Sequence, residues 1–182
     1  MKVLIVVDMQ NDFVDGVLGT PEAQAIVSNV AKKVEEYANN DDIVIYTKDT
    51  HYDNYLDTME GKKLPVPHCI KGTYGWRISQ AVDTMYDKAF VVDKPTFGYL
   101  HWGKTLDDII VNIYEKYVAV DSIELVGLCT DICVISNAMI LKAAYPETPV
   151  VVDASCCAGV TPRSHKNALE AMKMCQIDII GE

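Results

Sequence analysis

Six short runs rich in Val and Ile alternate along the chain with longer amphipathic segments. Each run is apolar on both faces, which is typical of a parallel β-strand buried between two layers of helices. The runs are Val3–Val7, Ile43–Thr47, Ala89–Val92, Ile123–Val126, Val150–Val152 and Ile177–Ile180. This alternation predicts an α/β fold: an open, mainly parallel six-stranded sheet with helices on both faces, in a Rossmann-like three-layer arrangement.

The segments between the runs carry signals for helix starts. Thr20 and Thr161 are each followed by proline, so each combines an N-cap side chain with a residue suited to the first helical turn. Thr105 is expected to cap a third helix, and a fourth is expected to begin near Asp131.

Length and charge bound the class of protein. The 182 residues predict a single domain, 1–182, and the formal net charge of −10 argues against nucleic acid or an anionic membrane as partner. No apolar run approaches the roughly 18 residues of a membrane helix, and the apolar start is too short for a signal peptide. We therefore expect a cytoplasmic protein whose six cysteines are reduced thiols.

Ionisable side chains follow two of the predicted strands. Asp8 comes after the first run and Lys94 after the third. Parallel sheets bind ligands beyond the carboxyl ends of their strands, so both residues are candidates for a site. A carboxylate close to apolar neighbours can have a raised pKa and act as a base. The competing interpretations are a turn or cap for Asp8 and a solvated side chain for Lys94.

Cys133 is expected in the first turn of a helix, because only a short turn follows the strand that runs into Gly127. A helix N-terminus lowers the pKa of a thiol and offers backbone N–H groups to an anion. The thiol is therefore a candidate nucleophile. A cysteine packed in the core is the competing interpretation.

Segment 49–77 is longer and more polar than most connections in a compact domain, which favours a functional loop insertion. Asp49 and His51 share one face of an extended chain, and His68 and Glu60 add a second imidazole and a second carboxylate. Such a set suits a divalent metal such as zinc, iron or manganese. A solvated acidic loop is the alternative.

Four segments, in this order and each beside a predicted strand end, resemble the isochorismatase-like cysteine hydrolases and, within them, the nicotinamidases. The resemblance runs from Val3 to about Ile180. The segments are Asp8–Phe13, then Thr47–His51 with Pro67–Cys69 and Gly72–Trp76, then Lys94–Phe97, and finally Gly127–Val134.

The resemblance implies an amidohydrolase that converts nicotinamide to nicotinate and ammonia in NAD salvage, through a cysteine thioester. Cys133 would attack the amide carbonyl, Asp8 would carry the proton, and Lys94 would hold Asp8 and favour the thiolate. Backbone N–H groups of Cys129 and Cys133 would form the oxyanion hole. The family also has a cis peptide bond at the position between Leu128 and Cys129.

The same resemblance implies one divalent metal, with zinc expected first and iron or manganese as alternatives. Its ligands would be Asp49, His51 and His68, with Glu60 or water completing the set. The metal would bind the ring nitrogen of a pyridine carboxamide, directly or through water, and orient the ring.

Aromatic side chains would form a wall around that ring. The residues that the resemblance assigns to this wall are Phe13, Trp76 and Tyr99. Relatives often associate, so a homo-oligomer is expected.

Two other hypotheses stay open. A related hydrolase acting on another small amide or a carbamoyl compound would use Cys133 without a metal. A small-molecule binder or redox protein on the same scaffold would leave Cys133 unreactive or disulfide-linked. Bound metal would argue against the first alternative, and thiol alkylation blocked by a substrate analogue would argue against the second.

Overall fold

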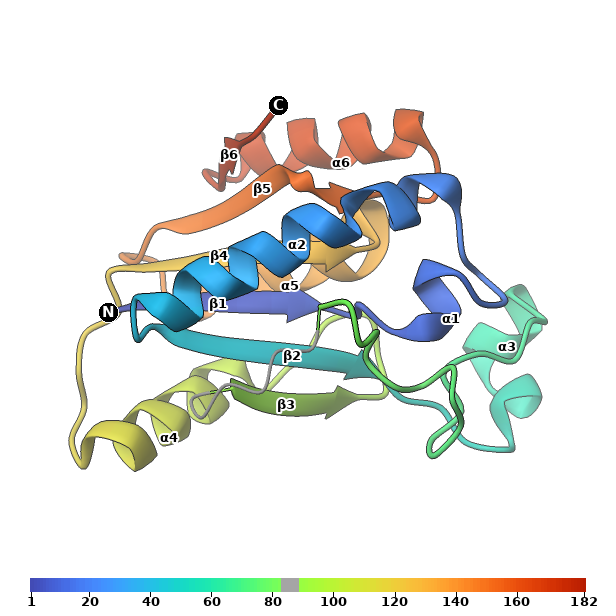
Figure 1. Ribbon diagram of the computed structural model, residues 1–182, viewed down its shortest axis with the longest axis horizontal. Coiled ribbons are helices and arrows are strands. Elements are labelled where there is room, and N and C mark those ends of the chain that lie inside the picture. The colour runs from blue at the N-terminus through green and yellow to red at the C-terminus, as the bar shows by residue number, and fades with distance from the viewer. Residues whose placement is uncertain (83–88) are drawn as a thin grey trace.

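The computed structural model of the chain describes residues 1–82 and 89–182 (Figure 1). At its centre is a sheet of six parallel strands in the order β3-β2-β1-β4-β5-β6. The strands are β1 (Lys2–Val7), β2 (Ile43–Asp49), β3 (Ala89–Lys94), β4 (Ser122–Leu128), β5 (Val150–Ala158) and β6 (Asp178–Ile180). The predicted α/β fold and all six predicted strands are confirmed, although β5 runs on to Ala158.

The side chains of β1 alternate between two cores. Odd-numbered residues of Val3–Val7 face one layer of helices, and the even-numbered ones face α2 (Pro21–Asn39), which lies along the opposite side of the sheet (Figure 1). The helices of the first layer are α4 (Trp102–Tyr114), α5 (Ile135–Ala144) and α6 (Pro162–Met174). Both faces are therefore covered, which explains why the strand is apolar on both sides.

Two helices begin where the cap signals predict. The Thr20 hydroxyl accepts the N–H of Ala23 at 3.0 Å, and the Thr161 hydroxyl accepts the N–H of Ser164 at 3.0 Å. These bonds satisfy N–H groups that the first turn of a helix leaves without a partner. Among the described residues, no helix is both long enough and apolar enough to cross a membrane.

The prediction that Thr105 caps a helix is wrong. Helix α4 already begins at Trp102, and the N–H of Thr105 donates to the carbonyl of His101 within its first turn. The buried indole of Trp102 donates to the Asn137 side chain at 2.8 Å, which anchors the start of the helix in the core. Tertiary packing therefore overrides the local cap signal.

Segment 49–77 folds beyond the carboxyl ends of the strands. It contains short elements that the sequence did not predict, namely a 3₁₀ turn (Tyr55–Asp57) and helix α3 (Met59–Lys63). Figure 1 shows α3 at the same end of the molecule as α1 (Asn11–Val14), which follows β1. The segment therefore lies beside the strand ends that carry the candidate residues.

The end of β4 passes unusually close to β1. Gly127 has a φ of +113°, and a Cβ at this position would lie 2.2 Å from the carbonyl oxygen of Val7. Only glycine combines this backbone conformation with so close an approach. The peptide bond between Leu128 and Cys129 is cis, as the resemblance to the isochorismatase-like cysteine hydrolases implies.

Replacing Gly127 by alanine is expected to lower the free energy of unfolding by about 3 kcal/mol or more, because strain and a backbone clash add together. Gly72→Ala is the matched control. Gly72 also has a positive φ, +88°, but a Cβ there would meet nothing within 4 Å. Its cost should be about 1 kcal/mol. Urea unfolding followed by circular dichroism measures both, and equal losses would contradict the close approach at Gly127.

Candidate active site

The strand ends bring the two predicted ionisable residues together. Asp8 follows β1, Lys94 ends β3, and Asp49, the last residue of β2, is paired with Lys94 in the strand register. Lys94 Nζ lies 2.6 Å from Asp8 Oδ2 and 3.6 Å from Asp49 Oδ1. The Lys94 side chain is 0% exposed, so these carboxylates provide the compensation that a buried ammonium needs.

Cys133 completes this group. It lies in a π-helical turn, Thr130–Val134, between β4 and α5, where a regular helical turn was predicted. Such turns are frequent at functional sites. Lys94 Nζ lies 3.5 Å from Cys133 Sγ and donates to it. All six cysteines of the chain are free thiols, as predicted.

Burial dominates the protonation of these side chains. It raises the pKa of Asp8, and the Lys94 ammonium offsets only part of that rise. It also raises the pKa of Cys133 well above the ordinary value, with Asp8 adding to the rise and Lys94 opposing it. Burial lowers the pKa of Lys94, but the three acidic neighbours raise it by more, so the ammonium form persists. The Cys133 sulfur is therefore a thiol at neutral pH, and the raised pKa of Asp8 makes its carboxylate a stronger base than an ordinary one.

Two side chains that the sequence did not single out position the carboxylates. The Thr47 hydroxyl donates to Asp8 Oδ1 at 2.6 Å and accepts the backbone N–H of Asp8 at 3.1 Å. The Gln10 amide donates to the Asp49 carbonyl at 2.9 Å and accepts the Asp49 N–H at 2.7 Å. Thr47 carried a weak signal, as a hydroxyl in an otherwise apolar run, whereas Gln10 carried none.

The Asn137 side chain holds the turn that carries Cys133 in place. Its amide donates to the carbonyl of Cys133 at 2.8 Å and to the carbonyl of Phe97 at 3.1 Å. It therefore ties the cysteine turn to the turn that follows Lys94. The signal that could have identified it is a polar amide on the apolar face of a predicted helix, since a buried amide needs hydrogen-bond partners.

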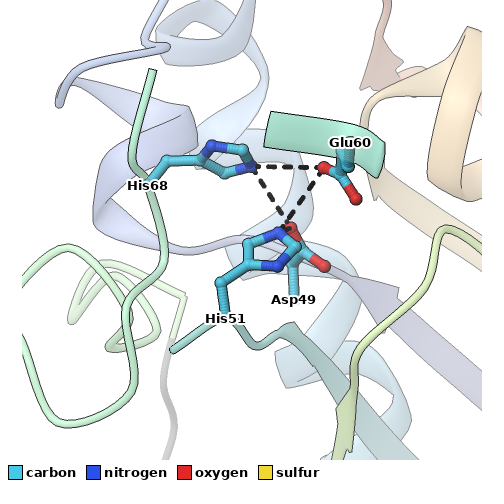
Figure 2. Close-up of side chains that lie close together, drawn as sticks. All are labelled: Asp49, His51, Glu60 and His68. Carbon is cyan, nitrogen blue, oxygen red and sulfur yellow. Dashed lines mark hydrogen bonds and ion pairs between the residues drawn. The ribbon is translucent and has the colours of Figure 1, made fainter. Parts of the chain in front are cut away.

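Four side chains from β2 and segment 49–77 converge on one another (Figure 2), and one of them, Asp49, is also a neighbour of Lys94. Asp49 Oδ2 lies 2.9 Å from His51 Nε2 and 3.4 Å from His68 Nε2. Glu60 Oε1 lies 3.5 Å and 3.8 Å from the same two nitrogens. One ligand atom from each residue lies within 4.8 Å of all the others. The structure therefore brings together all four residues that were predicted as metal ligands.

The donor set fits a divalent transition metal. His68 Nδ1 donates to the Val66 carbonyl at 2.8 Å, which directs Nε2 towards the two carboxylates. Metal-binding imidazoles are oriented in this way by backbone carbonyls. Two imidazoles with two carboxylates suit zinc, iron or manganese.

The charges of the cluster also favour a cation. Burial lowers the pKa of His51, but hydrogen bonds to Asp49 and Glu60 outweigh it and raise the pKa to about 9. Burial raises the pKa of Asp49, but hydrogen bonds from both histidines outweigh it and lower the pKa. The carboxylates therefore attract positive charge, and metal binding at neutral pH would release a proton from His51.

A cavity of about 650 Å³ is lined both by Cys133 and by three of the four candidate metal ligands, Asp49, Glu60 and His68. Cys133 lines it, and so does Cys129, the other residue predicted for the oxyanion hole. Phe13 also lines the cavity, and its ring centroid lies 5.4 Å from that of His68. Phe13 therefore lies in the cavity wall beside the four clustered residues.

The structure does not bring the other two predicted wall residues to this cavity. The Trp76 indole donates to the Thr50 hydroxyl at 2.9 Å, and Lys48 Nζ lies 3.3 Å from the ring centroid in a cation–π contact. The Tyr99 hydroxyl is hydrogen-bonded to that of Thr105 at 3.0 Å. Both rings are held by these neighbours, and neither belongs to the cavity lining formed by the described residues.

The sheet order, the cysteine in its wide turn and the buried lysine together define an isochorismatase-like hydrolase. The model of the isochorismatase domain matches residues 2–181, so the chain belongs to the isochorismatase family.

Within that family the similarity is to nicotinamidases and pyrazinamidases. The chain is 28% identical to the nicotinamidase/pyrazinamidase of Mycobacterium tuberculosis over 189 residues, covering 99% of this chain and 98% of that protein. The structure of pyrazinamidase/nicotinamidase from Streptococcus mutans is 30% identical, with a TM-score of 0.80 over 99% of this chain and 100% of that one. A pyrazinamidase from Pyrococcus horikoshii, in complex with zinc, has the same fold, with 24% identity and a TM-score of 0.78 over 100% and 99% of the two chains.

Lys94→Gln tests the electrostatic link to the thiol. Removing the ammonium is expected to slow alkylation of Cys133 at a fixed pH by at least about tenfold, because the charge that lowers the thiol pKa is lost. Peptide mapping by mass spectrometry after iodoacetamide treatment measures the rate at Cys133 separately from the other cysteines.

Lys48→Gln is the matched control, because Lys48 pairs with Asp93 and stacks on Trp76. It should leave the Cys133 rate unchanged. Lys94→Gln should also destabilise the fold by about 3 kcal/mol, since two buried carboxylates lose their partner. Thermal unfolding confirms that the variant is folded at the assay temperature. A folded variant with the wild-type alkylation rate would contradict the role of Lys94.

Proposed function

We propose that this chain is a cysteine amidohydrolase that converts nicotinamide and water to nicotinate and ammonia, a reaction of NAD salvage. The observation that carries the proposal is the buried group of Asp8, Lys94 and Cys133, in which Cys133 lines the same cavity as Asp49, Glu60 and His68 of the metal cluster. The similarity to nicotinamidases supports this choice of substrate.

In the first half of the reaction, Cys133 Sγ bonds to the amide carbon while the thiol proton passes to Asp8. Backbone N–H groups of Cys129 and Cys133 stabilise the oxyanion that forms. Asp8 then returns the proton to the amide nitrogen, the C–N bond breaks, and ammonia leaves a thioester behind. In the second half, Asp8 takes a proton from water, whose oxygen attacks the thioester. The C–S bond breaks, the sulfur regains the proton, and nicotinate departs.

Lys94 stabilises the negative charge as it moves between sulfur and carboxylate. Its ammonium lies close to both Cys133 Sγ and Asp8 Oδ2, so it favours the thiolate without being the base. Because burial raises the pKa of Asp8, its carboxylate is a stronger base for the thiol proton than an exposed carboxylate would be.

The proposed metal ligands are Asp49, His51, His68 and Glu60, and zinc is the metal that we propose, with iron or manganese as alternatives. The P. horikoshii pyrazinamidase, which has the same fold, is in complex with zinc. When bound, the metal would supply a Lewis-acidic partner for the pyridine nitrogen and thereby orient the ring. Phe13 would cover one side of the ring from the cavity wall.

The metal cluster distinguishes this proposal from the metal-free alternative. A hydrolase for another amide or a carbamoyl compound that needs no metal would have no use for the converging ligand atoms. It would also give no reason for the orientation of His68, whose Nε2 faces two carboxylates. The cluster therefore favours a substrate with a nitrogen that a metal can bind.

Purified protein is expected to release ammonia from nicotinamide, and Cys133→Ala should lower kcat by at least about a thousandfold, because the nucleophile is lost. Cys175→Ala is the matched control, since Cys175 is an exposed cysteine outside the cavity. It should retain wild-type activity. Ammonia release from nicotinamide by Cys133→Ala at the wild-type rate would rule out the proposed mechanism.

Removing the metal with a chelator should lower kcat/KM for nicotinamide by about tenfold or more, and adding zinc back should restore it, because ring orientation depends on the cluster. Metal content of the purified protein, measured by mass spectrometry, should be about one ion per chain. Glu60→Gln should weaken metal retention while leaving Cys133 open to alkylation. Full activity at zero metal would support the metal-free alternative.

A further inference from the structure

The cavity is larger than the proposed substrate requires. Its volume of about 650 Å³ falls in the middle of the roughly 300–1,000 Å³ range of pockets that enclose drug-sized ligands. Nicotinamide is a single ring with one amide group. Once its amide carbon lies at Cys133 and its nitrogen at the metal cluster, much of the cavity is still available.

The rest of the cavity is bounded by what we call the outer wall. Its members share two properties: each lines the cavity, and each is a large apolar side chain exposed to solvent. They are Met59 (70% exposed), Val160 (53%), Phe97 (44%) and Leu64 (39%). Three separate parts of the chain provide them, namely segment 49–77, the turn after Lys94 and the turn after β5.

An exposed apolar surface of this kind marks a place where an apolar group binds. The outer wall differs from scattered surface hydrophobic residues because its members line one cavity, which Cys133 also lines. A ligand that covered these side chains would bind more tightly in proportion to the apolar surface area that it removed from water. Unsubstituted nicotinamide, held at the inner end, is too short to do so.

Ring geometry indicates where such an apolar group would be attached. In a pyridine-3-carboxamide, ring carbons 2 and 6 adjoin the nitrogen, and carbons 2 and 4 adjoin the carbon that bears the amide. Carbon 5 alone adjoins neither. A substituent at carbon 5 therefore points away from both the metal cluster and Cys133 and meets neither of them.

We propose that the substrates of this chain include pyridine-3-carboxamides that carry an apolar group at ring carbon 5, with that group bound against the outer wall. The inference rests on the proposed function, because it uses the positions of the amide and of the ring nitrogen. It adds a subsite for the substituent and names the substrate class that the subsite selects.

The test compares ammonia release from nicotinamide, 5-phenylpyridine-3-carboxamide and 6-phenylpyridine-3-carboxamide. The two phenyl compounds have the same atoms, but the second places its phenyl group beside the ring nitrogen. The 5-phenyl compound is expected to have a kcat/KM at least about tenfold above that of nicotinamide, because a buried phenyl group adds binding energy. The 6-phenyl compound should fall below nicotinamide. Calorimetry with the zinc-loaded Cys133→Ala variant should give the same order of affinity without any turnover.

Variants of the outer wall locate the subsite. Met59→Ala and Val160→Ala should each lower the ratio of kcat/KM for the 5-phenyl compound to that for nicotinamide by about three- to tenfold. Leu100→Ala is the matched control, because Leu100 is 74% exposed in the turn after Lys94 but does not line the cavity. It should leave the ratio unchanged.

The outcomes separate the two proposals. Hydrolysis of nicotinamide without a gain for the 5-phenyl compound would overturn the subsite and leave the proposed function in place. Hydrolysis of the 5-phenyl compound alone would support the subsite and replace nicotinamide as substrate. If Met59→Ala and Val160→Ala instead dissociate an oligomer in analytical ultracentrifugation and change both substrates equally, the outer wall is an interface between copies of the chain and the subsite is rejected.

Discussion

The buried ammonium of Lys94 is the interaction on which the rest of the site depends. It lies between two carboxylates and a thiol, all of them withdrawn from water. Without it, the buried carboxylate of Asp8 would lose the cation that it contacts, and only His51 and His68 would offset the charge of Asp49. The parallel register that places Lys94 opposite Asp49, and the turn that brings Cys133 within reach, both bring partners to this one charge.

The sequence predicted the fold and the inner part of the site because a parallel α/β sheet constrains both. A strand buried on two faces must be apolar throughout, so the first ionisable residue after it marks its carboxyl end. Asp8 was located in this way, and Asp49 and Lys94 each lie one residue further on, after Lys48 and Asp93. Neighbouring strands then brought the three together. Cys133 needed only a short turn after its strand. The metal ligands depended more on the resemblance, because residues in a loop follow no fixed period.

The sequence revealed less about side-chain contacts and about competition between local signals. Trp76 has the chemistry of a stacking residue, but the sequence does not reveal that its ring contacts Lys48 and donates to Thr50. Thr105 has the chemistry of a cap, but the buried Trp102 begins the helix earlier. The outer wall was not predicted at all, because exposed apolar residues from separate turns share no pattern along the chain.

Asp49 belongs to both halves of the site. One carboxylate oxygen faces Lys94, and the other faces the imidazoles of His51 and His68. A metal ion bound at Asp49 Oδ2 would therefore weaken the attraction between Asp49 Oδ1 and Lys94 Nζ. This would change how strongly the Lys94 ammonium acts on the Cys133 thiol. With the proposed metal at that oxygen, the acidity of the Cys133 thiol would depend on whether the cluster holds an ion. Over evolution, loss of the metal would therefore be expected to require compensating substitutions around the thiol.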